Sequence, residues 1–155
     1  MLVWRIASRR HSALDGEGAR AAGGRWNSKG IPMVYTSATL SLAALEYLVN
    51  VGLEEAPADL VSISVEVPAT VSRRELGIGE LPASWRTYPA PERLAAIGTN
   101  WASSLESAVL IVPSCVIPEE KNWLVNPRHP DARRIRIEKK AAFRFDPRLR
   151  RRKAR

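Results

Sequence analysis

Glu46 is the only charged residue between Ala38 and Leu53, in a segment whose apolar residues recur at helical spacing. They cover nearly every face of the expected helix: Leu40, Leu42, Leu45, Tyr47, Val49 and Val51. Such a helix is expected to be mostly buried. An unpaired buried carboxylate is costly, so Glu46 must either reach an edge or lie in a cleft with hydrogen-bond partners. Position alone leaves open whether the Glu46 carboxylate has a functional or a structural role.

The segment 23–30 (GGRWNSKG) places basic residues and an aromatic residue among glycines. Glycines allow backbone amides to approach a ligand, and Arg25 can form a bidentate pair with a phosphate. Trp26 or Tyr35 could stack on a planar ring. The Gly-Lys-Ser/Thr ending of a phosphate-binding loop is missing, so a plain basic surface turn is the alternative.

Ser114 follows Pro113 at the end of the apolar run 108–112. A hydroxyl held rigidly at a sheet edge could be a nucleophile, but neither His11 nor His129 has a spacing that argues for a triad, and a turn serine is the alternative. The adjacent Cys115 is expected to be a buried apolar residue. Trp85 and Trp101 are interpreted as core residues or pocket walls.

These residues must be positioned by a mixture of strands and helices. Proline, glycine and apolar periodicity predict strands at 3–6, 31–37, 60–67 and 108–112, with shorter ones at 123–125, 135–137 and 142–145. Helices are predicted at 39–51, capped by Ser37 or Thr39, and at 91–104, while 8–29 and 74–90 are predicted to be irregular. The sequence therefore predicts a single α+β domain with two or three main helices.

Composition narrows the function class. The chain has 155 residues with 24 Lys and Arg against 16 Asp and Glu, a net charge of +8 that suggests an anionic partner. One cysteine excludes an intrachain disulfide, and together with two histidines it cannot build a zinc site, so no metal is expected. With neither an export signal nor a membrane span in view, we expect a soluble, cytoplasmic protein without membrane contact. Residues 148–155 are expected to form a disordered basic tail after a domain at 1–147.

In their order, these motifs resemble the RES domain, the toxin component of bacterial RES–Xre toxin–antitoxin pairs. Trp4 and Arg5 resemble the family's opening strand. The other matching blocks are 24–30 (GRWNSKG), 34–37 (VYTS), 42–46 (LAALE), 107–114 (SAVLIVPS), 122–130 (NWLVNPRHP) and 143–148 (FRFDPR). The Arg, Glu and Ser of the family name correspond to Arg25, Glu46 and Ser114.

The resemblance implies an ADP-ribosyltransferase-like fold and an enzyme that uses NAD as substrate, with no permanently bound cofactor. It would cleave the nicotinamide–ribose bond with water or phosphate as acceptor, depleting NAD and arresting growth, or would transfer ADP-ribose to a protein. An Xre-type helix-turn-helix antitoxin would block the active site in an oligomeric complex, and DNA would be contacted only through that antitoxin.

The resemblance also implies roles for individual residues. Glu46 would stabilise the positive charge that develops on the ribose, and Arg25 would bind the pyrophosphate or orient the ribose. Tyr35 would stack on the nicotinamide, and Ser114 would hold the ribose or the amide. Further pocket candidates are Trp26, Asn27, Lys29, Trp101 and Asn126. The roles of Arg5, Arg25, Tyr35 and Ser114 could be divided in more than one way.

Two function classes compete with this reading. The charge of +8 and the basic tail would suit a nucleic-acid-binding module, although no recognition helix, zinc site or RNA-binding aromatic motif is present. An inert partner-binding subunit would fit the apolar helix but would leave Arg25, Glu46 and Ser114 unexplained.

Overall fold

The computed structural model describes residues 1–149, which form one α+β domain around a seven-stranded sheet. The strands are β1 (Leu2–Ser8), β2 (Val34–Ser37), β3 (Leu60–Glu66), β4 (Arg73–Glu75), β5 (Val109–Pro113), β6 (Lys121–Val125) and β7 (Arg136–Ala142). Their order in the sheet is β4-β5-β6-β2-β1-β3-β7. Only β4 and β5 are parallel, and the other neighbours are antiparallel. Residues 150–155, most of the predicted tail, lie outside the described residues.

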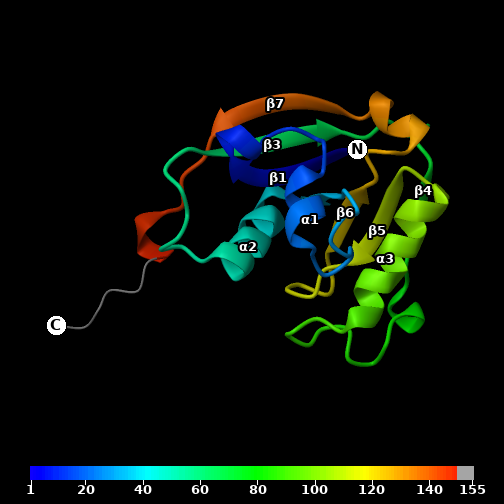
Figure 1. Ribbon diagram of the computed structural model, residues 1–155. Helices are drawn as coiled ribbons and strands as arrows, with labels where there is room; N and C mark the ends of the chain where they lie inside the picture. The colour runs from blue at the N-terminus through cyan, green and yellow to red at the C-terminus, as the bar shows by residue number, and fades with distance from the viewer. Residues whose placement is uncertain (150–155) are drawn as a thin grey trace.

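Three α-helices accompany the sheet: α1 (Glu17–Ala22), α2 (Leu40–Val51) and α3 (Glu92–Ser104). Short 3-10 helices occur at Arg9–His11, Ile78–Glu80, Pro130–Arg134 and Pro147–Leu149. In Figure 1, β1, β3 and β7 run across the top with α1 and α2 below them, while α3 lies in front of β5. The helices thus cover one side of a curved sheet, and α2 packs against β1 and β2.

Helix α2 begins and ends where its sequence signals predict. The Thr39 hydroxyl accepts a hydrogen bond from the backbone N–H of Leu42 (3.1 Å), which is an N-cap contact. Gly52 follows the helix with a φ of 79°, a conformation that costs glycine little. The expectation of a mostly buried helix was wrong, because only Leu42 and Ala43 are fully buried. Leu45 and Val49 remain 40% and 65% exposed, since no element within residues 1–149 covers the outer face of α2.

Two other predictions need correction. Helix α1 lies in the segment that was expected to be irregular, and its six residues, with Gly18 among them, are too few to give a periodic signal. The strand near the C-terminus is one continuous β7 at 136–142 instead of two pieces, with the second piece largely beyond its end. Charged residues occupy its exposed positions because β7 is an edge strand.

Strand alternation divides the core between the two faces of the sheet. In β5, Val109 and Ile111 belong to one apolar cluster, whereas Leu110 and Val112 belong to another that includes Trp85, Leu94 and Trp101. The second cluster joins α3 to β5 and β6. A smaller cluster, centred on Ile6, Ala43 and Leu60, joins α2 to β1 and β3. These two clusters therefore pack α3 and α2 against the sheet.

Gly98 of α3 packs closely against the segment that contains Arg25. A Cβ atom built on Gly98 would lie 1.9 Å from the carbonyl oxygen of Trp26, which belongs to the backbone and cannot rotate away. Gly18 of α1 is also helical, but a Cβ there meets nothing within 4 Å.

We predict that Gly98→Ala lowers the free energy of unfolding by about 1–3 kcal/mol, because α3 must move away from Trp26. Gly18→Ala is the matched control and should be neutral or stabilising by up to about 1 kcal/mol, from helix propensity. Urea denaturation of both variants measures the difference. Equal stability of the two variants would contradict the close packing at Gly98.

Candidate active site

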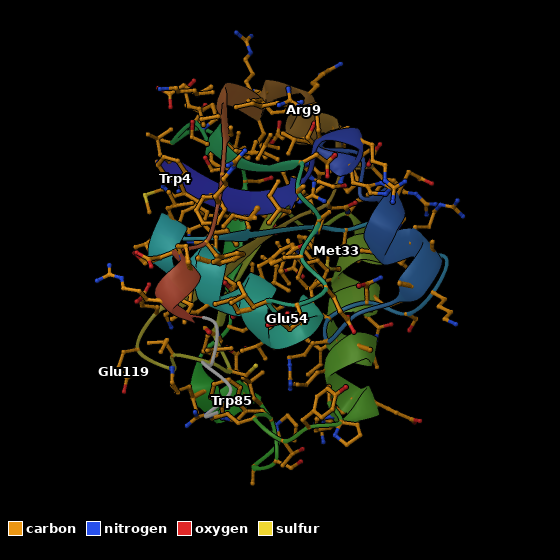
Figure 2. All side chains as sticks on the ribbon, turned by 90° about the vertical axis from the view of Figure 1, so that its left-hand side faces the viewer. Trp4, Arg9, Met33, Glu54, Trp85 and Glu119 are labelled. Atoms are coloured by element: carbon orange, nitrogen blue, oxygen red, sulfur yellow. The ribbon has the colours of Figure 1, made fainter. Side chains whose placement is uncertain are left out.

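A cavity of about 200 Å³ lies between α2 and the middle of the sheet. Its walls come from one helix and three strands: Trp4, Arg5 and Ile6 of β1, Tyr35, Thr36 and Ser37 of β2, Asn122 of β6, and Ala43, Glu46, Tyr47, Asn50 and Val51 of α2. Figure 2 shows Trp4 on β1 on one side of α2, and Trp85 of the β4–α3 connection on the other. Among the lining residues are one carboxylate (Glu46), one arginine (Arg5) and three aromatic residues (Trp4, Tyr35 and Tyr47).

The Glu46 carboxylate accepts two hydrogen bonds at the same oxygen. The Ser114 hydroxyl donates to Oε1 at 2.8 Å, and the Asn122 amide Nδ2 donates to Oε1 at 2.6 Å. The Ser37 hydroxyl in turn donates to Oδ1 of Asn122 at 2.7 Å. The structure therefore brings Glu46 and Ser114 together as the sequence suggested, and it adds Asn122 and Ser37, which the sequence reasoning did not single out.

Ser114 is fully buried and does not line the cavity. Besides donating to Glu46, its hydroxyl accepts hydrogen bonds from the backbone N–H groups of Val116 (3.1 Å) and Ile117 (3.0 Å). One donor and two acceptor positions are all that a serine hydroxyl has. Direct contact between this hydroxyl and a ligand would therefore require at least one of these bonds to break.

Arg25 lies beside the site but does not line the cavity. Its Nη1 donates to the carbonyl oxygens of Trp85 (2.9 Å) and Thr87 (3.2 Å), and its Nη2 also donates to Thr87 (3.2 Å). These bonds hold the β4–α3 connection against the segment around Arg25. The guanidinium is therefore already occupied by backbone acceptors on one side.

Cys115 is partly exposed, which corrects the expectation of a buried thiol. Desolvation raises the pKa of Cys115, the charges of Arg25 and Arg86 lower it, and the charge of Glu46 raises it. Arg25 and Glu46 thus both act on the same thiol. Of these two charged residues, only Glu46 lines the cavity.

Tyr35 lines the cavity, but its hydroxyl serves the neighbouring loop. It accepts a hydrogen bond from the backbone N–H of Trp26 (3.0 Å) and donates one to Oδ1 of Asn27 (2.7 Å). Burial raises the pKa of Tyr35 far above its ordinary value, an effect that the Trp26 N–H and the Arg25 charge only partly offset. The phenol is therefore a neutral donor, and its ring remains available to the cavity.

Five of the predicted pocket residues are not brought to this cavity. Trp26 and Asn27 are buried, and the Asn27 amide donates to backbone carbonyls that shape the loop. Lys29 is exposed on that loop. Trp101 is buried and donates to the Ser107 hydroxyl (2.9 Å), while the Asn126 amide donates to the carbonyl oxygen of Ala102 (2.8 Å). Aromatic and amide residues in the sequence gave no signal that separates a structural role from a binding role.

Arg5 is the arginine that lines the cavity. Its Nη1 donates to the carbonyl oxygen of Ala13 at 2.8 Å. Desolvation lowers the pKa of Arg5 and the charge of Asp15 raises it, yet a guanidinium remains protonated at neutral pH. The charge in an otherwise apolar strand was the available sequence signal.

Residues 1–149 contain neither a metal site of clustered side chains nor a membrane-spanning helix. No group of three or more His, Cys, Asp and Glu side chains in this range is placed to hold a metal ion. None of the helices described there combines the length and the hydropathy needed to cross a membrane.

Comparisons with known proteins agree on the family. The RES domain profile matches residues 2–147. A protein of Sphingobium sp. (strain YBL2) named Prs ADP-ribosylating toxin is 40% identical over 152 residues, covering 94% of both chains. A protein of Yersinia enterocolitica named Toxin Res is 37% identical over 152 residues, covering 96% of this chain and 99% of its own.

A solved structure supports the fold independently. The crystal structure of the M. tuberculosis MbcT–MbcA toxin–antitoxin complex matches with a TM-score of 0.75 over 92% of this chain and 83% of that one. Sequence identity is 18%, so this likeness concerns the fold alone. From the profile match and the curated relatives together, the chain belongs to the RES domain family of toxins.

Proposed function

We propose that this toxin is an enzyme that cleaves the nicotinamide–ribose bond of NAD, with NAD bound as substrate in the cavity beside Glu46. The observation that carries the proposal is a carboxylate whose Oε1 is fixed by two donors while the residue lines a cavity with Arg5 and Tyr35. A negative charge at a fixed place is what a reaction with a developing positive charge requires.

The chemistry follows from the leaving group. The bond between C1′ of the ribose and the pyridinium nitrogen breaks, and its electron pair goes to that nitrogen, so nicotinamide leaves as a neutral molecule. The ribose acquires oxocarbenium character, which the Glu46 carboxylate stabilises as carboxylates do in glycoside cleavage. No general acid is needed for such a leaving group, which suits a cavity without histidine among its lining residues.

The cavity residues divide the remaining tasks. Arg5 faces the cavity and suits the pyrophosphate or a ribose hydroxyl, whereas the Tyr35 and Trp4 rings suit the planar nicotinamide. Arg25, which the family resemblance would assign to the pyrophosphate or to the orientation of the ribose, is held by the backbone carbonyls of Trp85 and Thr87. We assign to it the positioning of the β4–α3 connection beside the bound dinucleotide, with direct contact to the pyrophosphate as the alternative.

The acceptor of the ribosyl group is the second part of the proposal. Water and phosphate both attack C1′ to give free products, whereas a protein side chain would become ADP-ribosylated. The name of the Sphingobium relative favours transfer to a protein as the second candidate function. Mass spectrometry of the products, with and without phosphate and with a cell extract as protein acceptor, distinguishes the three outcomes.

The partner proposal rests on the solved relative, which is a toxin in complex with its antitoxin. An enzyme that consumes NAD would arrest its own host, so we propose a cognate antitoxin that blocks the cavity in an oligomeric complex. We keep the Xre helix-turn-helix type and DNA contact through the antitoxin alone as parts of this proposal. The catalytic unit would be 1–147, in keeping with the 2–147 match to the family.

We predict that Glu46→Gln lowers nicotinamide release from NAD by at least about a hundredfold and leaves the fold intact. The amide is nearly isosteric but cannot supply the negative charge. Nicotinamide release is measured by chromatography, and thermal unfolding serves as the control for folding. Wild-type turnover by Glu46→Gln would remove Glu46 from the mechanism.

Substrates of different length can distinguish the roles of Arg5 and Arg25. Arg5→Lys is predicted to raise KM for NAD by about tenfold, since a bidentate donor is lost, with a much smaller effect on nicotinamide riboside, which has no phosphate. Arg25→Lys should affect both substrates similarly if Arg25 only holds the β4–α3 connection. A selective defect of Arg25→Lys toward NAD would instead assign the pyrophosphate to Arg25.

A further inference from the structure

Asn122 has the geometry of a residue that acts through Glu46. Its Oδ1 accepts from the Ser37 hydroxyl while its Nδ2 donates to Glu46 Oε1, and the second bond allows only one orientation of the amide because a carboxylate only accepts. If the amide were turned over, Oδ1 would face the carboxylate oxygen at 2.6 Å and the contact would be repulsive. The carboxylate of Glu46 therefore determines which end of the Asn122 amide faces it, and the Ser37 hydroxyl holds the other end in place.

The backbone around Asn122 is equally constrained. Asn122 pairs with Ser37 of β2 on one side and with Val112 of β5 on the other. Ser114, the second donor to Oε1, follows directly on β5. Asn122 thus lies within a paired interior strand and Ser114 directly after another. The sheet therefore fixes the backbone of both donors opposite α2.

The two oxygens of Glu46 are consequently unequal. Oε1 accepts from both Ser114 and Asn122, whereas Oε2 accepts no hydrogen bond from the residues in 1–149. Glu46 lines the cavity, while Ser114 does not. We propose that Asn122 is a positioning residue for catalysis which, fixed by Ser37 and acting with Ser114, holds Glu46 through Oε1 so that Oε2 is presented to the substrate.

This inference rests on the proposed function for its kinetic test. Asn122→Ala removes the donor and is expected to lower kcat for nicotinamide release by about tenfold to a hundredfold, as misplaced catalytic groups do, with little change in KM. Ser37→Ala leaves the donor but removes the hydrogen bond that holds the other end of the Asn122 amide. It should therefore also lower kcat, by less than Asn122→Ala does.

The sharper variant is Asn122→Asp, which keeps the size and the Ser37 contact but puts a second carboxylate against Oε1. Two carboxylates this close cannot both be ionised at neutral pH, so the pair takes up a proton. The acidic limb of the pH–rate profile should move upward by about one pH unit or more, with activity recovered at higher pH.

Asn50→Asp is the matched control. Asn50 lines the same cavity, but its amide donates to the backbone carbonyl oxygen of Glu46 (2.8 Å) rather than to the carboxylate. This variant adds the same charge to the same cavity and should move the acidic limb much less. Equal displacement in Asn50→Asp and Asn122→Asp would show a general charge effect and overturn the positioning role.

A measurement without turnover separates this inference from the proposed function. The ¹³C signal of the Glu46 carboxyl, assigned by its loss in Glu46→Gln, reports proton uptake directly in the purified protein. A higher midpoint of this titration in Asn122→Asp supports the contact even if the wild-type protein releases no nicotinamide, which would refute the proposed function alone. An unchanged titration, or an active wild type with unimpaired Asn122→Ala, would overturn the inference.

Discussion

The structure depends on one shared acceptor, the Oε1 atom of Glu46. Its donors are Asn122 on β6 and Ser114 just after β5. The strand order β5-β6-β2 places Ser37 beside Asn122, although β2 is far from β5 and β6 in the chain. Only Ala38 and Thr39 separate β2 from α2, so the strand that holds Ser37 also delivers the helix that holds Glu46. Thr39 caps α2 and donates to the Glu120 carboxylate (3.0 Å), while the backbone of Glu120 accepts from Ser114. The start of α2 is therefore tied to the turn that carries Ser114.

The structure narrows the range of anionic partners that the net charge suggests. An excess of +8 suits any polyanion, but most basic residues for which positions are described lie on exposed surfaces, as in the edge strand β7. Arg5 is different, because it lies in a cavity wall where water is partly excluded and electrostatic attraction is stronger. A single guanidinium at such a place selects a small anion with a planar group attached more readily than it selects an extended nucleic-acid backbone.

Local signals in the sequence were sufficient for the fold class and for several elements. Alternation in 60–66 and the cap at Thr39 both depend on near neighbours in the chain, and both elements occur as predicted. The sheet order, the short α1 and the exposed side of α2 depend on packing between distant segments, which no local pattern contains. The same holds for the site. Glu46 was identifiable as a lone charge in an apolar helix, whereas Asn122 looks like an ordinary polar residue at the start of a strand until Ser37 and Glu46 are placed beside it.

Ser114 illustrates why position in the sequence cannot assign a chemical role. A serine directly after a buried strand is where a nucleophile would be expected, yet its hydroxyl is saturated by Glu46, Val116 and Ile117 and is fully buried. The two arginines differ in degree: Arg25 uses three of its five N–H groups on backbone carbonyls, whereas Arg5 uses one, at Nη1, within the described residues. Groups whose bonding capacity is spent inside the protein hold the site together. Those with the most capacity left, Glu46 Oε2 and the Arg5 guanidinium, also belong to residues that line the cavity, where a substrate can reach them.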